Sequence, residues 1–369
     1  MTGRTADDVI SPRIQRLTAG SPPAPRPELG PDKPVRRLHL NECPFPPSPK
    51  VVAAMREAAA ALNSYPDHEG TALVRALAGR IGVTPERIVI GAGSNELLYT
   101  SADVALDPGD EAIAPVPGFV TYPKVIALRG GIYVGVPVRD DGIVDVDAML
   151  AAVTPATRLV FVATPNNPTG GFMSAEELDR LATSLPDNLL LHVDEAYYEF
   201  SRHAGGPDVL AILSRRRGPW IVTRSFSKAY GLAGARVGYG ITSTPVLAEA
   251  YRKARTTFSV GAVALAGATA ALAEPEYVKT LLDHTAAERE RMLRALVPTG
   301  FQALPSAANF VMFLTPAPAA DLAAVLREEN IHVLRVSWRD SPGALRISIG
   351  TREDTDAVIA ALAASLTGA

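Results

Sequence analysis

Short apolar runs alternate with longer segments of helical spacing through the middle of this chain. Strands are predicted at residues 87–90, 111–114, 158–162, 189–193, 220–223 and 237–241. Their residues are apolar without alternation, which is typical of strands that are covered on both faces. Helices are predicted at 49–62, 72–81 and 95–105. Strands separated by helices predict an α/β fold with a mainly parallel, doubly wound sheet.

The pattern changes after about residue 262. Helices at 262–273, 286–296 and 354–365 and strands at 310–313 and 345–349 predict a smaller α+β domain. Residues 11–49 are rich in proline, which disfavours regular helix and central strand, so an irregular arm is expected there. The predicted division is an N-terminal arm, 1–48, that joins the small domain, a large ligand-binding domain, 49–262, and a small C-terminal domain, 263–369.

Composition removes several classes of protein. The chain has 369 residues, is 47% hydrophobic and carries a formal net charge of −3, which suits two domains and gives no basic surface for nucleic acid. No apolar run approaches the roughly 20 residues of a membrane span, and the polar start does not resemble a signal peptide. One cysteine, Cys43, excludes an internal disulfide, and the six histidines show no ligand spacing, so no metal site is expected. A cytoplasmic enzyme is the expectation.

The most informative residue is Lys228, which follows the predicted strand 220–223 and lies in sequence between Ser225, Ser227 and Arg236. A lysine amine can form an imine with an aldehyde, and hydroxyls with a guanidinium can hold a phosphate. Pyridoxal 5′-phosphate (PLP) carries both groups, so this segment predicts that cofactor. The alternative is an exposed lysine beside a solvated loop, the commonest fate of a single lysine.

Polar or glycine residues also follow other predicted strands. Gly93, Ser94 and Asn95 lie between a strand and a helix, where backbone N–H groups attract phosphate, although an ordinary turn would have the same sequence. Asn167 lies in the proline-braced segment 165–170, which would hold its side chain rigidly toward the phenolate oxygen of the cofactor. An ordinary proline turn is the alternative for this segment.

Asp194 and Tyr197 follow the predicted strand 189–193. An unpaired carboxylate at a buried strand end is costly, and a protonated pyridine nitrogen would relieve that cost while strengthening the ring as an electron sink. Tyr197 could reach the same phenolate oxygen as Asn167. A structural aspartate that caps a helix is the alternative for Asp194, and the two interpretations are about even for this residue alone.

The co-occurrence of these residues favours the functional interpretation. Open α/β sheets bind ligands at the carboxyl ends of their strands, so polar residues that follow several strands are expected to converge. Each of seven residues is expected just past a strand, in the order Asn167, Asp194, Tyr197, Ser225, Ser227, Lys228 and Arg236.

With these motifs the chain resembles the class I/II PLP-dependent aminotransferases of fold type I. Within them it is most similar to the histidinol-phosphate aminotransferase family and to bacterial aromatic amino-acid aminotransferases. The likeness extends from Leu40 to Glu353, and its most specific segments are 165–170, 194–197 and 225–234. It implies an imine at Lys228, an ion pair between Asp194 and the ring nitrogen, and contacts of Asn167 and Tyr197 with the phenolate oxygen.

The resemblance implies further cofactor contacts. The residues that would contact the phosphate are Ser94, Ser225, Ser227 and Arg236. Phe119 would stack on the pyridine ring. Tyr65 would reach the cofactor phosphate of a neighbouring subunit, so a homodimer with shared active sites is expected.

The resemblance also implies a substrate-binding set. Arg346 would grip a carboxylate or another anionic group through its planar fork, and Arg335 would help to bind a substrate phosphate. Asn41 and Phe45 lie in the segment Asn41–Pro46, where the family commonly reads Asn-Glu-Asn-Pro-Tyr-Gly. Phe45 lacks the hydroxyl that would bind a phosphate, and Phe258 is also apolar at a substrate-facing position, which together favour a more apolar substrate.

The expected activity is ping-pong transfer of an amino group from a small-molecule donor, histidinol-phosphate-like, to 2-oxoglutarate as the oxo-acid acceptor. Lys228, once displaced, would carry a proton in this reaction. An aromatic or other amino-acid aminotransferase of a specialised pathway and a phosphothreonine-type decarboxylase are the alternatives. A PLP-sensing domain of a transcription regulator is the non-enzymatic alternative, but no basic helix-turn-helix segment precedes residue 40.

Overall fold

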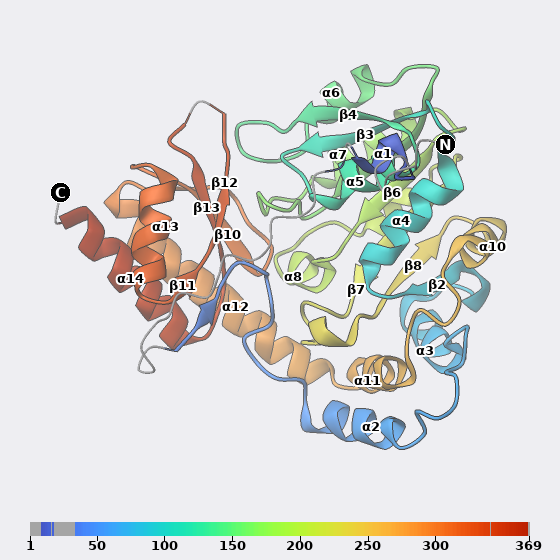
Figure 1. The fold of residues 1–369 in the computed structure, drawn as a ribbon, viewed down its shortest axis with the longest axis horizontal. Coiled ribbons are helices and arrows are strands. Elements are labelled where there is room, and N and C mark those ends of the chain that lie inside the picture. Colours follow the sequence, from blue (N-terminus) through green and yellow to red (C-terminus); the bar gives the residue numbers. More distant parts are fainter. Residues whose placement is uncertain (1–8, 16, 18–33, 340, 368–369) are drawn as a thin grey trace, which may run out of the picture.

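A computed structural model describes residues 9–15, 17, 34–339 and 341–367 (Figure 1). Its centre is a seven-stranded sheet of order β2-β8-β7-β6-β5-β3-β4. All described strands of this sheet run parallel except β8, which pairs antiparallel with both neighbours. The strands are β2 (Ile88–Gly91), β8 (Gly238–Thr242), β7 (Trp220–Ser225), β6 (Leu190–Asp194), β5 (Thr157–Ala163), β3 (Glu111–Val116) and β4 (Ile132–Pro137).

The sheet separates two apolar clusters, which explains the continuous apolar character of its strands. Val160 and Val162 of β5 belong to one cluster, and Leu159 and Phe161 of the same strand belong to the other. Helices that supply the first cluster include α2 (Pro49–Ala59), α3 (Thr71–Ile81), α6 (Val146–Ala151), α7 (Ala175–Ser184), α9 (Val209–Leu213) and α11 (Ala262–Leu272). Helices that supply the second are α4 (Ser94–Ala105), α5 (Thr121–Leu128) and α10 (Pro245–Ala254). The predicted doubly wound arrangement is confirmed.

A second sheet lies at the left of Figure 1 and is antiparallel, with the order β12-β13-β10-β9. Its strands are β9 (Gln302–Ala303), β10 (Phe310–Leu314), β12 (Leu334–Val336) and β13 (Ala344–Ser348). Phe313 and Leu345 pack in a separate apolar cluster with α13 (Ala319–Glu328) and α14 (Arg352–Thr367). The arm joins this region through β1 (Arg36–Arg37), which pairs with β11 (Ile331–His332).

The helix α12 (Pro275–Leu296) connects the two regions. Val278 and Leu281, near its start, pack in the apolar cluster of the large sheet, whereas Met292 and Leu296, near its end, pack in the cluster of the small sheet. The helix α11 also packs against α2, in the large cluster. The domain boundary after residue 262 stays a prediction, but the packing changes from one core to the other within α12.

Several predicted elements differ from those observed. The helix expected at 49–62 is α2, which begins at Pro49 as expected but ends at Ala59, and the helix expected at 286–296 is only the second half of α12. The sequence pattern does not predict β4, an edge strand whose exposed and half-buried residues alternate irregularly. Within the proline-rich arm, Pro12–Gln15 form the short helix α1, while residues 18–33 lie outside the described part of the chain.

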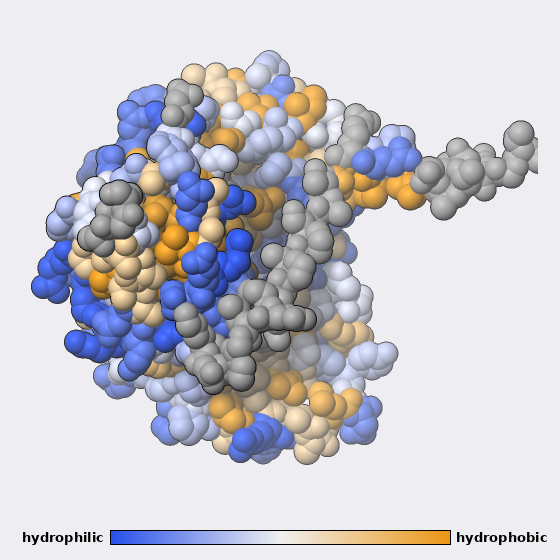
Figure 2. All heavy atoms as spheres, turned by 60° about the vertical axis from the view of Figure 1, so that its left-hand side comes forward, coloured by the Kyte–Doolittle hydropathy of each residue, from blue (hydrophilic) through white to orange (hydrophobic). Residues whose placement is uncertain are grey.

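The surface view in Figure 2 shows apolar side chains that reach the surface between hydrophilic ones on this face. The exposed large apolar residues of the described chain include Leu62, Tyr65 and Phe258. Within the described residues, every helix is too short or too polar to cross a lipid bilayer.

Candidate active site

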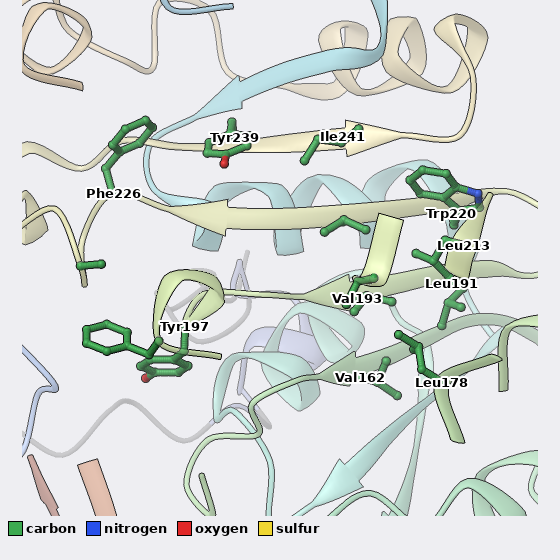
Figure 3. Close-up of a cluster of buried hydrophobic side chains, with 14 of the residues drawn as sticks. Val162, Leu178, Leu191, Val193, Tyr197, Leu213, Trp220, Phe226, Tyr239 and Ile241 are labelled. Carbon is green, nitrogen blue, oxygen red and sulfur yellow. The ribbon is translucent and has the colours of Figure 1, made fainter. Parts of the chain in front are cut away.

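The polar residues predicted to converge lie at the carboxyl edge of the large sheet. Asp194 is the last residue of β6 and is the register partner of Ala163, at the end of β5, and of Thr223 on β7. Figure 3 shows Tyr197 and Phe226 beyond the strand ends at this edge, with Trp220 at the opposite edge. The parallel strands therefore deliver their following loops to one place.

Lys228 is half-buried and held against the N-terminal arm. Its Nζ donates to the backbone oxygens of Leu40 and Asn41, both at 3.1 Å. Burial lowers the pKa of Lys228 to about 8, and the nearby guanidiniums of Arg346 and Arg236 act in the same direction. A substantial neutral fraction at neutral to mildly alkaline pH is what a nucleophilic amine requires.

A connected set of side chains lies beside Lys228. Tyr197 Oη accepts from Asn41 Nδ2 at 2.8 Å and from Asn167 Nδ2 at 3.3 Å. The Oδ1 atom of Asn167 accepts from Arg346 Nη1 at 2.5 Å, and Arg346 Nη2 donates to the His39 carbonyl at 2.5 Å. Arg346 is 6% exposed and its Nε has no partner among the described residues. The structure thus brings Asn41, Asn167, Tyr197 and Arg346 together from four separate segments.

Asp194 is 5% exposed, and burial raises the pKa of its carboxyl group to about 6. Thr223 Oγ1 donates to its Oδ1 at 3.2 Å, and Tyr122 Oη donates to its Oδ2 at 3.4 Å. Hydroxyls stabilise a buried carboxylate only in part. A cationic ring nitrogen would stabilise the ionised form directly, so this carboxyl group fits a protonated pyridine.

The start of α4 and the loop after β7 form a small cradle. A Cβ atom on Gly93 would lie 2.6 Å from Arg236 Nη2, and one on Gly238 would meet the backbone nitrogen of Ser94. The N-cap of α4 has no side-chain hydrogen bond, which leaves backbone N–H groups available to an anion. Because Ser94 begins this helix, the cradle fits a phosphate group.

The hydroxyls of the loop complete this cradle. Ser225 Oγ accepts from the backbone nitrogen of Ser227 at 3.1 Å, and Ser227 Oγ accepts from Arg236 Nη1 at 3.3 Å. The sequence placed Arg236 after a strand, but it precedes β8. Because β8 runs opposite to its neighbours, its first residues lie at the carboxyl edge of the sheet. Arg236 therefore lies beside Ser227 because it precedes β8, not because it follows a strand.

Two further predicted cofactor residues each contact the start of α5. Asn95 accepts at Oδ1 from Thr121 Oγ1 at 3.1 Å. Phe119 is half-buried and makes an edge-on contact with Tyr122, with ring centroids 5.9 Å apart. Since Tyr122 contacts Asp194, Phe119 lies close to the position expected for the ring.

Three predicted residues are not part of this cluster. Tyr65 is 83% exposed and stacks on Phe258, with centroids 4.8 Å apart. Phe45 contacts His284 edge-on, with centroids 4.8 Å apart. Arg335 is exposed.

The register of the small sheet explains the position of Arg335. Its partner on β13 is Leu345, whereas Arg346 is opposite Leu334. Directly opposite residues of an antiparallel pair share a face and successive residues alternate, so Arg335 and Arg346 lie on opposite faces. The substrate role of Arg335 stays a prediction that this pairing does not favour.

Sequence analysis missed the hydroxyls and the imidazole around Asp194. Thr223 and His192 lie in the predicted strands 220–223 and 189–193, and Tyr122 lies three residues after Phe119. The available signal was spacing: His192 precedes Asp194 by two residues on one strand, and residues at that spacing share a face. A histidine inside an otherwise apolar buried strand also needs a polar partner.

Comparisons with known proteins agree with this geometry. The family model described as "Aminotransferase class I and II" matches residues 33–362. The chain is 37% identical to "Histidinol-phosphate aminotransferase 2" of Carboxydothermus hydrogenoformans, over 86% of this chain and 87% of the relative. It is 40% identical to "Aromatic amino acid aminotransferase" of Rhodococcus opacus, over 88% of each.

A similar fold is found among solved structures. Histidinol-phosphate aminotransferase from Sinorhizobium meliloti, solved in complex with pyridoxal-5′-phosphate, superposes with a TM-score of 0.89 at 34% sequence identity. The superposition covers 98% of each chain.

Proposed function

The chain belongs to the class I and II aminotransferases, and from this premise we propose that it moves the amino group of a ring-bearing compound to 2-oxoglutarate. It is a PLP-dependent enzyme of fold type I. The donors named for its relatives, histidinol phosphate and aromatic amino acids, share a planar ring. The proposed donor is therefore an amine that carries a planar ring, the feature that these two kinds of compound share.

The cofactor supplies an electron sink that makes the hydrogen on the amine-bearing carbon acidic. In the proposed site, Asp194 would hold the ring nitrogen protonated, and Asn167 and Tyr197 would orient the ring through its phenolate oxygen. The phosphate would be held by the start of α4, at Gly93, Ser94 and Asn95, and by Ser225, Ser227 and Arg236. Phe119 would cover the ring.

Lys228 has two proposed roles. Its neutral amine would bond to the aldehyde with loss of water. Once displaced by the substrate amine, its Nζ would take the proton from the amine-bearing carbon and donate it to the cofactor carbon that carried the aldehyde. The lowered pKa of Lys228 supports both roles, because only the unprotonated nitrogen can attack or accept a proton. Contact with the carbonyls of Leu40 and Asn41 positions the nitrogen at the edge of the sheet.

The proposed substrate class rests on Arg346, which would bind the anionic group of the donor. Its guanidinium reaches Asn167 Oδ1, and Asn167 in turn reaches Tyr197, so a carboxylate on Arg346 would lie beside the cofactor. Arg335 lies on the opposite face of the same strand pair. With one arginine on this face and an apolar Phe45 in the arm, an aromatic amino acid whose carboxylate binds Arg346 is the favoured donor.

Histidinol phosphate is the second candidate. The relatives that carry this name support it, as does the similar solved structure. Arginine binds phosphate through the same bidentate fork as carboxylate, so Arg346 could hold the phosphate of this donor. A contribution from Arg335 would strengthen that binding.

A donor panel tests the proposal. Phenylalanine, tyrosine, histidinol phosphate and a small aliphatic amino acid are each supplied with 2-oxoglutarate, and glutamate formation is measured. Glutamate from the aromatic donors with the highest kcat/KM supports the favoured assignment, and release of carbon dioxide without glutamate would overturn amino transfer in favour of a decarboxylase.

Arg335→Ala separates the two donors. If histidinol phosphate is the substrate and Arg335 binds it, this variant raises KM for histidinol phosphate and leaves KM for phenylalanine unchanged. Arg346→Ala should raise KM for both. The pair of variants therefore assigns the anionic group of the donor to one arginine or to both.

The quaternary structure and location are also proposals. Tyr65 is exposed and stacked on Phe258, which suits an aromatic side chain that completes a neighbouring subunit's site. Mixing Tyr65→Ala with Lys228→Ala subunits would then produce one intact site per mixed dimer and recover up to about a quarter of the activity. A lack of recovery in a proven mixed dimer would contradict shared sites. A cytoplasmic location stays a prediction.

A further inference from the structure

A continuous series of hydrogen bonds runs through the interior from α10 to Asp194. Tyr251 Oη lies 2.5 Å from Ser101 Oγ, which lies 2.6 Å from His192 Nδ1. His192 Nε2 lies 2.9 Å from Thr223 Oγ1, and Thr223 donates to Asp194 Oδ1 at 3.2 Å. All five side chains are at most 5% exposed. These residues are called the Asp194 chain below.

The fold explains why these groups meet. His192 and Asp194 are two residues apart on β6, so their side chains leave the same face of the sheet. Thr223, on the adjacent strand β7, is the register partner of Asp194 and lies between the two side chains. Ser101 approaches this face from α4, and its other neighbour, Tyr251, comes from α10.

The number of hydrogens on these side chains limits the directions in which the hydrogen bonds of the Asp194 chain can run. Thr223 has one hydroxyl hydrogen, and donating it to an ionised Asp194 leaves its oxygen to accept from His192 Nε2–H. Nδ1 is then an acceptor, so Ser101 donates to it and Tyr251 donates to Ser101. In this orientation every hydroxyl and the imidazole donate toward the carboxylate.

The opposite orientation requires a protonated Asp194. The carboxyl group would donate to Thr223, Thr223 to Nε2, and Nδ1–H to Ser101. Ser101 could then donate to the Leu97 carbonyl, which lies 2.9 Å from its Oγ. The chain therefore has two self-consistent orientations, and the tautomer of His192 reports which one is present.

We propose that His192 is a positioning residue for amino transfer: as the Nε2–H tautomer it directs the hydroxyl of Thr223 to Asp194 and keeps that carboxylate ionised toward the cofactor ring nitrogen. The inference rests on the proposed role of Asp194. Burial also lowers the pKa of His192 to about 3, so the ring is neutral and has a single hydrogen to place. His192 does not touch the reacting atoms in this arrangement and acts through Thr223.

Other groups also influence Asp194. Tyr122 Oη donates to the second carboxylate oxygen, the Ala196 backbone N–H donates as well, and Tyr197 lies nearby. Glu195 raises the pKa of Asp194, and Lys228 is the nearby cation. None of these groups belongs to the Asp194 chain. Substitutions of Thr223 or His192 therefore leave them in place.

The tautomer is measurable without any cofactor. In ¹⁵N-histidine-labelled apoprotein, the His192 signals are identified by their loss in His192→Gln. At pH 7–8, above the titration of Asp194, Nε2 is expected to carry the hydrogen and Nδ1 to be the bare acceptor. A hydrogen on Nδ1 in that pH range would overturn the proposal, whatever the enzyme's substrate proves to be.

Cofactor binding gives the second test. Thr223→Val removes the hydroxyl that donates to Asp194, and the loss of a hydrogen bond to a charged group corresponds to about 10- to 100-fold weaker PLP binding. His192→Leu should have a similar effect, and His192→Gln should restore part of the affinity because its amide can donate to Thr223. The pH midpoint of the imine absorbance should move in the same variants.

Thr242→Val is the matched control. Thr242 is a fully buried threonine on β8 whose hydroxyl donates to the Arg87 and Thr244 carbonyls, away from Asp194. It should lower the melting temperature without changing PLP affinity or the absorbance midpoint. Equal effects of Thr223→Val and Thr242→Val on PLP affinity would overturn the inference. Failure of the wild-type protein to bind PLP would instead refute the proposed function and leave the tautomer result standing.

Discussion

The two edges of the large sheet both carry many charged residues, yet only one has the properties of a reaction site. From the amino edge, a cavity of about 890 Å³ extends along the sheet and is lined by five arginines, Arg80, Arg87, Arg216, Arg217 and Arg224. Most of these guanidiniums are already engaged by protein. Arg216, just before β7 at the amino edge, donates to four backbone carbonyls at 2.8–3.0 Å. Arg224, near the end of β7, forms a buried ion pair with Glu195 at 2.8 Å.

At the carboxyl edge the charged groups are held less completely. Lys228 contacts two carbonyls, and Asp194 has hydroxyl donors and no described ion-pair partner within 4 Å. Their pKa values move toward neutrality, to about 8 and about 6. A cluster of charged side chains therefore indicates a reaction site only where the protein itself does not fully stabilise those charges, so that a ligand can supply the rest.

The largest expected effect is at Lys228. Lys228→Ala should lower turnover by about 10³-fold or more, because it removes both the bond to the cofactor and the proton carrier. Glutamate formation and the imine absorbance measure this loss, and an unchanged melting temperature shows that the fold is intact. Lys253→Ala, an exposed lysine on α10, is the control and should retain full activity. Normal turnover in Lys228→Ala would show that the reaction does not take place at the carboxyl edge of the sheet.

Asp194→Asn is expected to lower kcat by about 10²- to 10³-fold while PLP remains partly bound, because the ring nitrogen loses its ionic partner. Steady-state kinetics with saturating cofactor separate this effect from weaker binding. Thr242→Val controls for a general loss of packing in the same sheet. A kcat close to that of the wild type would show that the ring does not depend on this carboxylate.

At the amino edge the expected effect is on stability. Arg216→Ala leaves four buried carbonyls without their donor and should reduce the free energy of unfolding by about 3–5 kcal/mol. Urea denaturation measures this change. The turnover of the folded enzyme should stay within about twofold of the wild type. Arg217→Ala is the neighbouring control: this exposed side chain makes no hydrogen bond or ion pair with the described residues, so a change within about 0.5 kcal/mol is expected.

The smallest effect concerns pH. Because the pKa of Lys228 is lowered to about 8, the neutral fraction of its amine rises about tenfold per pH unit below that value and levels off above it. The rate of imine formation between apoprotein and PLP should follow this curve in stopped-flow absorbance. A midpoint near 10.5, the ordinary value for lysine, would show that burial does not activate this amine.

Much of the site could be predicted from sequence because its residues follow strands with strong apolar patterns. Lys228, Asp194 and Asn167 each lie in a short motif beside such a strand. The antiparallel direction of β8 could not be predicted, because strand direction depends on pairing with distant residues and leaves no mark in local hydrophobicity. Arg236 was therefore identified correctly as a neighbour of Ser227 but for an incorrect structural reason.

Other features needed the three-dimensional register. The sequence gives Arg335 and Arg346 similar surroundings, and only the pairing of β12 with β13 separates their faces. The Asp194 chain joins residues from two helices and two strands that are distant in sequence, such as Ser101 and Tyr251, so no local pattern encodes it. The early start of α12 at Pro275 was missed because charged residues interrupt the apolar spacing there.

The reversed direction of β8 has a consequence for how this enzyme can diversify. The loop between β7 and β8 leaves and re-enters the sheet at one edge, and a hydrogen bond from Phe226 to Val237 closes it. Lys228 and Arg236 thus lie on one loop whose ends are joined by a hydrogen bond. Arg346 lies on a different sheet, which has its own apolar core. If Arg346 binds the substrate as proposed, mutations that shift the second sheet can change substrate preference without altering the spacing between Lys228 and Arg236.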